Sequence, residues 1–174
     1  MGDARIGQMC RNVPQLLTSK IETLEEKVDW VQEALSLSDD ELCGLFREFP
    51  ILFTLNPVKR LEPRLQFLRL TFQLNDDGMR EMLLRMPGLF AYSEETMEKK
   101  LNFYAKLIGK KAAKKLVSEK PYLIGNYSLE KRLEPRLKEV QKSGKKVKWD
   151  ESMIKRLALR SDEVWEKYGV GDAR

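Results

Sequence analysis

The sequence has no histidine, only two cysteines and no long apolar run. Without histidine, the chain lacks the commonest general base and the commonest metal ligand of proteins. Cys10 and Cys43 lie far apart without metal-type spacing, which indicates buried or idle thiols in a reducing compartment. No apolar run approaches the ~20 residues that a membrane-spanning helix needs. We therefore expect no membrane insertion.

Motifs for catalysis are also missing. The sequence holds no glycine-rich phosphate loop, no nucleophile elbow and no metal-ligand spacing. The acidic groups at 39–41 and 76–77 fall where helices are expected to begin, and acids are favoured there by the helix dipole. We therefore predict a protein that is not an enzyme and that takes no cofactor, metal or small-molecule substrate.

Two short phrases recur about every 36 residues along the chain. The first is typified by Leu-Glu-Pro-Arg-Leu and occupies residues 24–28, 61–65, 97–101 and 133–137. The second is a Pro-x-Leu-Leu-like phrase at residues 14–17, 50–53, 87–90 and 121–124. Self-similarity at this period is typical of stacked-repeat proteins. Strand signals are missing throughout.

The unit at 56–92 shows how such a repeat is expected to fold. Asn56 and Pro57 begin it, and Pro63 fits the first turn of a longer helix. The expected buried positions are apolar residues at helical spacing: Leu61, Leu65, Leu68 and Phe72 in the first helix, and Met79, Met82, Leu83 and Met86 in the second. Residues 87–90 are predicted to form a short buried helical turn.

These patterns predict an all-α superhelical α-solenoid, with two helices and a short helical turn per unit. We expect one domain over residues 1–174, with units at about 5–18 (partial), 19–55, 56–92, 93–127 and 128–170. The predicted caps are Ser19, Asn56, Ser93 and Ser128, with a capping box between Ser19 and Glu22. The predicted loops are residues 36–40, 75–78, 109–111 and 143–150, and residues 152–167 are expected to form one closing helix. The array begins in mid-repeat, which indicates missing upstream sequence or a half-repeat cap.

Charge is distributed unevenly along the chain. Residues 1–98 hold 11 Lys and Arg against 17 Asp and Glu, whereas residues 99–174 hold 21 against 10. This asymmetry indicates that the C-terminal half contacts a polyanion. The alternative is that the lysines only keep exposed helices soluble.

The fourth position of the Leu-Glu-Pro-Arg-Leu phrase is basic in every unit: Lys27, Arg64, Lys100 and Arg136. One cation per unit could form a row that contacts nucleic-acid phosphates. Alternatively, each cation pairs with a Glu of its own or the neighbouring unit, or lies on an indifferent surface. The glutamates at the second position, Glu25, Glu62, Glu98 and Glu134, are interpreted as first-turn acids that complement the helix dipole.

Two further basic groups are candidates for phosphate contact. Lys110, Lys111, Lys114 and Lys115 form one helical face with no acidic neighbour before Glu119. Lys145, Lys146 and Lys148 lie in a glycine-containing loop that ends at Trp149. The indole could stack on a base, or it could pack back under the last helix.

The repeated phrases, and the ending at residues 159–168, resemble those of the mitochondrial transcription termination factor (mTERF) family. The third unit lacks the family's proline, and the array is shorter than usual. The resemblance implies a superhelix of three-helix units, left-handed, with a basic concave face that binds double-stranded DNA or RNA. It also implies a mitochondrial location, or alternatively a plastid one, and the absence of a transit peptide then indicates a processed or trimmed chain.

The sequence thus favours an organellar nucleic-acid-binding repeat protein that acts mainly through backbone contacts. Its expected role lies in transcription termination, RNA processing or ribosome assembly. The alternative is a structural or adaptor solenoid in a larger complex such as an organellar ribosome. In that case the acidic N-terminal half would contact protein partners.

Overall fold

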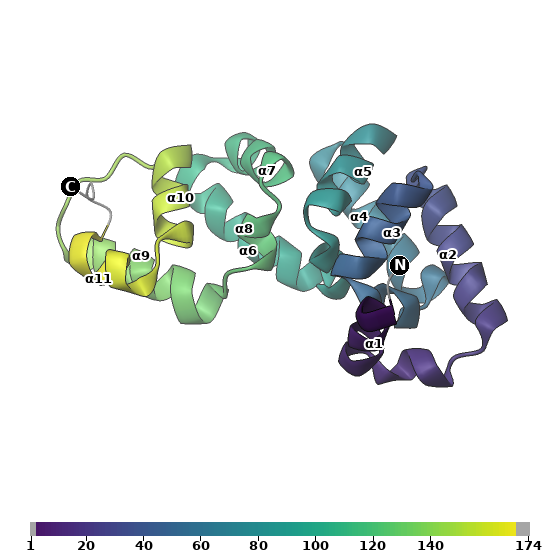
Figure 1. Cartoon of the computed structure of the whole chain (residues 1–174). Helices are drawn as coiled ribbons and strands as arrows, with labels where there is room; N and C mark the ends of the chain where they lie inside the picture. Colours follow the sequence, from purple (N-terminus) through teal and green to yellow (C-terminus); the bar gives the residue numbers. More distant parts are fainter. Residues whose placement is uncertain (1–2, 170–174) are drawn as a thin grey trace. The chain divides into compact units, whose positions relative to one another are not determined.

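The computed structural model describes residues 3–169, and side chains from residue 6 onward. The described residues are all-helical, without strands (Figure 1). The elements of the first half are α1 Asp3–Asn12, η1 Pro14–Thr18, α2 Ile21–Leu35, α3 Asp39–Glu48, η2 Pro50–Thr54, η3 Pro57–Leu61, α4 Glu62–Phe72, α5 Asp76–Arg85 and η4 Pro87–Ala91. Those of the second half are α6 Glu94–Ile108, α7 Lys110–Glu119, α8 Tyr122–Gly125, η5 Leu129–Leu133, α9 Glu134–Lys142, α10 Glu151–Leu159 and α11 Asp162–Tyr168.

The described chain divides into two compact units, one up to Glu94 and the other from Glu95. The boundary falls at the start of the predicted repeat 93–127. The expectation of a single domain over 1–174 stays a prediction, and its ends at 1–2 and 170–174 lie outside the described residues. The handedness of the superhelix also stays a prediction. The all-helical repeat fold itself is confirmed.

Proline determines how the first helix of each repeat begins. Where the repeated phrase contains Pro63 or Pro135, a π-helical turn precedes the α-helix: η3 before α4, and η5 before α9. Where the phrase lacks proline, α2 and α6 run through the same positions as continuous helices of 15 residues. Because proline has no N–H to donate, the preceding turn widens, and Leu61 N bonds Asn56 O at 3.3 Å.

The repeated Pro-x-Leu-Leu phrases form short helical turns, as predicted. They are η1, η2 and η4, which are 3₁₀-helical, and α8. Leu52, Leu89 and Leu123 of these turns are buried. The expectation of burial is wrong for η1, which has no buried residue and leaves Leu17 73% exposed.

Most of the predicted apolar stripe lies in the core. Leu61 and Leu83 are fully buried, and the side chains of Leu68, Met79 and Met82 are at most 2% exposed. Three members of the stripe are only half-buried: Leu65, Phe72 and Met86. They lie at the edge of the buried face, where side chains stay in part on the surface.

Several predicted helix ends need correction. The capping box at Ser19 is absent, because the Ser19 hydroxyl donates to Gln15 O at 2.9 Å and α2 begins after Lys20. A capping box forms instead between Ser38 and Glu41 at the start of α3. The caps at Asn56 and Ser128 are confirmed.

Predicted loops are shorter than expected where a polar residue caps the following helix. Asn75 accepts a bond from Gly78 N at 2.9 Å, so most of the segment 75–78 belongs to α5. The irregular segment at 143–150 is confirmed and connects α9 to α10 (Figure 1). The single closing helix at 152–167 is wrong. Ser161 caps a new helix by accepting from Val164 N at 3.3 Å, which separates α11 from α10.

The glutamates of the repeated phrase occupy two kinds of position. Glu62 and Glu134 are first-turn acids of α4 and α9, as predicted. Glu25 and Glu98 lie one turn further into α2 and α6, because those helices begin earlier in the absence of proline.

Candidate nucleic-acid interface

The repeated cations all make the same intramolecular contact. Lys27 donates to Phe53 O at 2.7 Å, and Arg64 donates to Phe90 O. In the second compact unit, Lys100 donates to Ile124 O, and Arg136 donates to Leu157 O at 2.8 Å. We call these four contacts the repeat clasps. Each joins the first helix of a repeat to a backbone carbonyl that lies 21 to 26 residues later in the same repeat.

The repeat clasps explain why the two repeated phrases share one period. In three of the four clasps, the acceptor is the fourth residue of the Pro-x-Leu-Leu phrase, namely Phe53, Phe90 and Ile124. A carbonyl at the end of a short helical turn has no partner within that turn. The cation supplies the donor, and a buried carbonyl without a donor would be costly.

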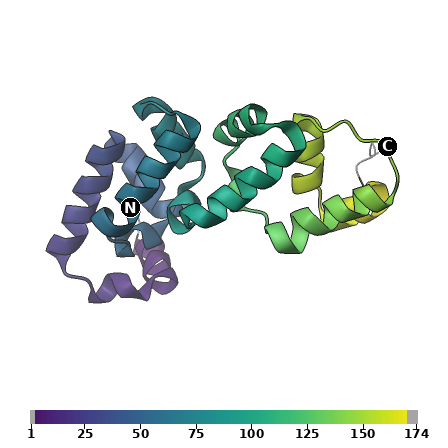
Figure 2. The ribbon, with the colours of Figure 1, turned by 180° about the vertical axis from the view of Figure 1, so that it is seen from behind.

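Arg136 makes further contacts that fix the last helix. Its second terminal nitrogen bonds Asp162 Oδ1 at 2.6 Å, and its guanidinium lies 4.8 Å from the centroid of the Trp165 ring. The Trp165 Nε1 donates to Glu139 Oε2 at 2.6 Å. Both views of the chain show α11 alongside α9 (Figure 1, Figure 2). A single buried arginine therefore stabilises the junction between these two helices.

Burial distinguishes the clasp cations from surface lysines. Lys100 is 5% exposed and Arg136 is 4% exposed, and Arg64 is half-buried. Burial lowers the pKa of Arg64, Lys100 and Arg136, because a charge is less stable away from water. This arrangement favours the intramolecular alternative for the repeated cations, although the acceptor is a backbone carbonyl rather than the expected Glu. Phosphate contact by Arg64, Lys100 and Arg136 stays a prediction.

Helix α7 presents the second predicted group to solvent. Lys110, Lys111 and Lys115 are exposed, and Lys114 is half-buried, while Ala113, Leu116 and Val117 form the buried face. Lys115 lies 3.9 Å from Glu119, in a loose and exposed ion pair. Glu151 also lies near Lys115. Lys110, Lys111 and Lys114 form no ion pair among the described residues and remain available to an external anion.

The lysines of α7 lie where a helix does not favour them. The first turn of α7 has no acidic residue and begins with Lys110 and Lys111. The N-terminal end of a helix carries a partial positive charge, so cations there are unfavourable. Lys114 and Lys115 follow at i+4, where like charges repel. An anion bound at this face would relieve both repulsions.

The third predicted group lies between α9 and α10. Lys145, Lys146 and Lys148 are exposed and line a pocket of about 400 Å³ together with Arg156. The acid of this pocket is Asp150, which caps α10 by accepting from Met153 N at 2.9 Å. Cations therefore dominate the pocket.

Packing of Trp149 under the last helix stays a prediction. Trp149 is half-buried and lines a cavity of about 300 Å³ together with Ile108 and Leu116. The indole thus lies against the region of α6 and α7. Stacking of Trp149 on a base stays a prediction.

Comparison with known proteins decides the family. The mTERF family model matches residues 1–166. The chain belongs to the mTERF family. It is also similar to the Arabidopsis thaliana protein "Transcription termination factor MTERF8, chloroplastic", with 25% identity over 114 residues. That match covers 66% of this chain and 23% of the relative, so the chain spans about a quarter of the relative's length.

Membership of the mTERF family suggests a role in organellar gene expression and nucleic-acid binding. The family consists of helical nucleic-acid-binding proteins and is not typically enzymatic. Within the described part of this mTERF chain, no group of three or more Cys, Asp or Glu side chains is arranged to hold a metal ion. None of the helices described between residues 3 and 169 has the length and apolar character that crossing a bilayer requires.

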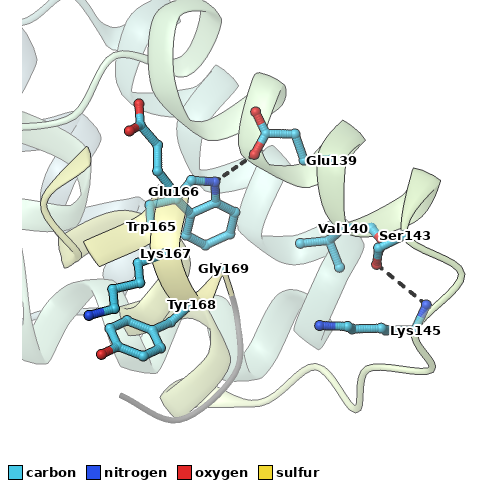
Figure 3. Close-up of a pocket in the computed structure, with 9 residues that line it drawn as sticks. All are labelled: Glu139, Val140, Ser143, Lys145, Trp165, Glu166, Lys167, Tyr168 and Gly169. Carbon is cyan, nitrogen blue, oxygen red and sulfur yellow. Dashed lines mark hydrogen bonds between the residues drawn. The ribbon is translucent and has the colours of Figure 1, made fainter. Parts of the chain in front are cut away.

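Some residues near the predicted site were not identified from the sequence. A pocket of about 290 Å³ lies between α9 and α11 and includes Glu139, Trp165 and Tyr168 (Figure 3). The last two residues belong to the ending that resembles mTERF proteins. The resemblance of that ending indicated a family, but it gave no function for the side chain of Trp165 or of Tyr168.

Proposed function

We propose that the chain binds nucleic acid, RNA or double-stranded DNA, mainly by contacting backbone phosphates. The observation that supports this proposal is the basic face of α7, where Lys110 and Lys111 occupy an unfavourable helix terminus and the first turn has no acidic residue. The lysines at 145, 146 and 148 provide a second exposed basic group in the same compact unit. Salt-sensitive binding through these residues would serve transcription termination, RNA processing or ribosome assembly in an organelle.

The experiment is a titration of labelled duplex RNA and DNA at several salt concentrations. Neutralising about four phosphates gives a slope of about −3.6 for log K against log salt with B-form DNA. Charge reversal of Lys145, Lys146 and Lys148 to Glu is expected to weaken binding and flatten this slope. A control in the first compact unit reverses three basic residues, Lys59, Arg60 and Arg69. The absence of salt-sensitive binding to any nucleic acid would contradict the proposal.

The predicted contacts of Arg64, Lys100 and Arg136 require a separate test. Replacing each by Met removes the charge and also breaks a repeat clasp. A phosphate contact predicts a shallower salt slope in a variant that stays folded. A purely intramolecular role predicts lower stability and an unchanged slope.

A second candidate function is that of a structural or adaptor subunit. The first compact unit favours it, because acids outnumber bases in residues 1–98 and three of its apolar side chains are at least 70% exposed: Leu17, Ile21 and Leu70. Such a surface suits a basic protein partner with apolar side chains. Crosslinking in organelle extracts would support this function if links to one protein cluster in the first unit while nucleic-acid binding is absent.

The location within the cell is part of the proposal. The family resemblance favours mitochondria, and the name of the Arabidopsis thaliana relative favours the plastid alternative. An antibody against the chain, applied to fractionated mitochondria and plastids, distinguishes the two. Detection in neither organelle would contradict both.

A further inference from the structure

Helix α1 and the turn η1 form a half repeat, because they correspond to the second helix and the short turn of the later repeats. Ile6 lies eight residues before Pro14 and is 47% exposed. The residues eight positions before the corresponding prolines are all buried, namely Leu42, Met79 and Ala113. Met9 and Cys10 are only half-buried, although their equivalents in the three later repeats are buried. A face of α1 is thus uncovered that the later repeats bury.

The turn η1 is uncovered in the same way. Leu17, the fourth residue of its Pro-x-Leu-Leu phrase, is 73% exposed, whereas Phe90 and Ile124 at the equivalent position are at most 1% exposed. The Leu17 carbonyl accepts no hydrogen bond from the described residues. The carbonyls of Phe53, Phe90 and Ile124 each accept one from a clasp cation. The half repeat therefore has the acceptor of a repeat clasp without the cation.

The later repeats show which kind of element covers this face. Helix α2 packs on α3 and η2, and helix α4 packs on α5. These covering helices are the first helices of their repeats, and each contributes buried apolar side chains together with a clasp cation, Lys27 or Arg64. The element that complements the half repeat is therefore an amphipathic helix with a Lys or Arg beside its apolar stripe.

Two other occupants fit this face less well. A second folded copy of the chain has no free clasp cation to donate, because all four already bond a carbonyl of their own repeat: Lys27, Arg64, Lys100 and Arg136. Nucleic-acid phosphates are hydrogen-bond acceptors, so they cannot supply a donor to the Leu17 carbonyl. Acids also outnumber bases in residues 1–98, which disfavours a polyanion and favours a basic helix.

We propose that the half repeat of α1 and η1 binds an amphipathic helix of a different protein, in the position that the first helix occupies in a later repeat. Apolar side chains of this helix cover Ile6, Cys10 and Leu17, and its Lys or Arg donates to the Leu17 carbonyl. The expected partner pattern is Leu-x-x-Lys/Arg-Leu, as in the repeated phrase of this chain. The inference rests on the adaptor function, the second candidate above, and adds to it a surface and the chemistry of the partner.

The experiment uses a labelled synthetic peptide with the sequence of residues 56–73, which contains Arg64 and the apolar stripe of α4. Its binding to the whole chain is measured by fluorescence anisotropy. Leu17→Asp should lower the affinity at least tenfold, because it places a charge on the apolar face. The matched control is Leu70→Asp, the same change at an exposed leucine of α4 in the same compact unit.

A second peptide tests the clasp itself. The Arg64→Met change in the peptide keeps an apolar stem but removes the donor for the Leu17 carbonyl. We expect about tenfold weaker binding, because a hydrogen bond from a charged group is lost. Both leucines are exposed in the whole chain, and thermal unfolding identifies any variant that fails to fold.

Each outcome supports or overturns the inference. Weaker binding with Leu17→Asp and with the Arg64→Met peptide, but not with Leu70→Asp, supports it. Absence of peptide binding overturns it, as does binding that Leu17→Asp leaves unchanged. A dimer of the chain that dissociates on Leu17→Asp, without peptide binding, would show that a second copy covers the face.

Crosslinking separates this inference from the adaptor function. Links to one protein that cluster in the first compact unit but outside α1 and η1 would keep the adaptor function and overturn the inference. The absence of both a crosslinked protein and peptide binding would overturn the two together. Links from α1 and η1 to a helix with the expected basic pattern support both.

Discussion

Reversing the charge of Lys110 and Lys111 tests the basic face of α7 in two ways at once. We expect the double change to Glu to stabilise the fold and to weaken nucleic-acid binding. The two residues are exposed and occupy the first turn of α7, after Gly109. A substitution that merely disrupts the fold would lower both stability and nucleic-acid binding. A gain in stability together with weaker binding therefore distinguishes the electrostatic effect from disruption of the fold.

The expected gain in stability follows from two electrostatic contributions. A charge in the first helical turn contributes about 0.3–1 kcal/mol through the helix dipole, and reversal changes its sign from unfavourable to favourable. Each glutamate also acquires an attractive partner at i+4, Lys114 or Lys115, in place of a repulsive one, which adds about 0.2–0.5 kcal/mol per pair. With allowance for exposure to salt, we expect a total of about 1–2 kcal/mol at low ionic strength. For a chain of this length, that raises the melting temperature by about 4 °C.

The assay combines thermal unfolding by circular dichroism with a salt-dependent titration of duplex nucleic acid. The Lys59→Glu, Arg60→Glu variant has the same change in net charge, but in the first compact unit. It should leave duplex binding almost unchanged. A lower melting temperature in the α7 variant would refute the helix-dipole argument. Unchanged affinity together with an unchanged salt slope would refute the assignment of α7 to phosphate binding.

The other predictions concern stability. Arg64→Met breaks a repeat clasp and leaves a buried carbonyl without its donor, so urea unfolding should show a loss of about 1–3 kcal/mol; no loss would contradict the clasp. Leu61→Ala should cost about 2–5 kcal/mol and half-buried Leu65→Ala clearly less, and equal costs would contradict the assigned buried face. The backbone N–H of Ser38, followed by Arg80, lowers the pKa of Glu41 below 4.5. This carboxylate therefore contributes stability above pH 4.5 that is lost as the pH falls through the folded-state pKa. Glu41→Gln should reduce the loss of stability on acidification, and an equal loss in the variant and the unchanged chain would contradict this contribution.

The repeat period and the positions of the prolines made much of this fold predictable. The recurrence of Pro-x-Leu-Leu predicted the short turns, and helical spacing predicted the burial of Leu61, Leu68 and Leu83. The break at Ser161 was also readable, because a Ser followed by two acids is a common helix start. The expectation of one long closing helix overlooked that signal.

The acceptors of the repeated cations could not be predicted from the sequence. Each is a backbone carbonyl, which every residue possesses, so no residue type marks it. Because glutamates recur at a fixed position of the repeated phrase, the expected partners were glutamate side chains instead. The pocket between α9 and α11 was hidden for a similar reason. Glu139 and Trp165 lie 26 residues apart, and only the packing of two helices brings them together.

The repeat clasps make each repeat self-contained. The cation and its acceptor lie 21 to 26 residues apart and always fall within one predicted unit. A duplication of residues 56–92 would therefore copy Arg64 together with the Phe90 carbonyl, and a deletion of the same span would remove both. Arrays of this kind can gain or lose whole repeats without leaving a buried cation that lacks its acceptor. A change of half a repeat would separate the cation from its acceptor, so chain length is expected to vary in steps of one repeat.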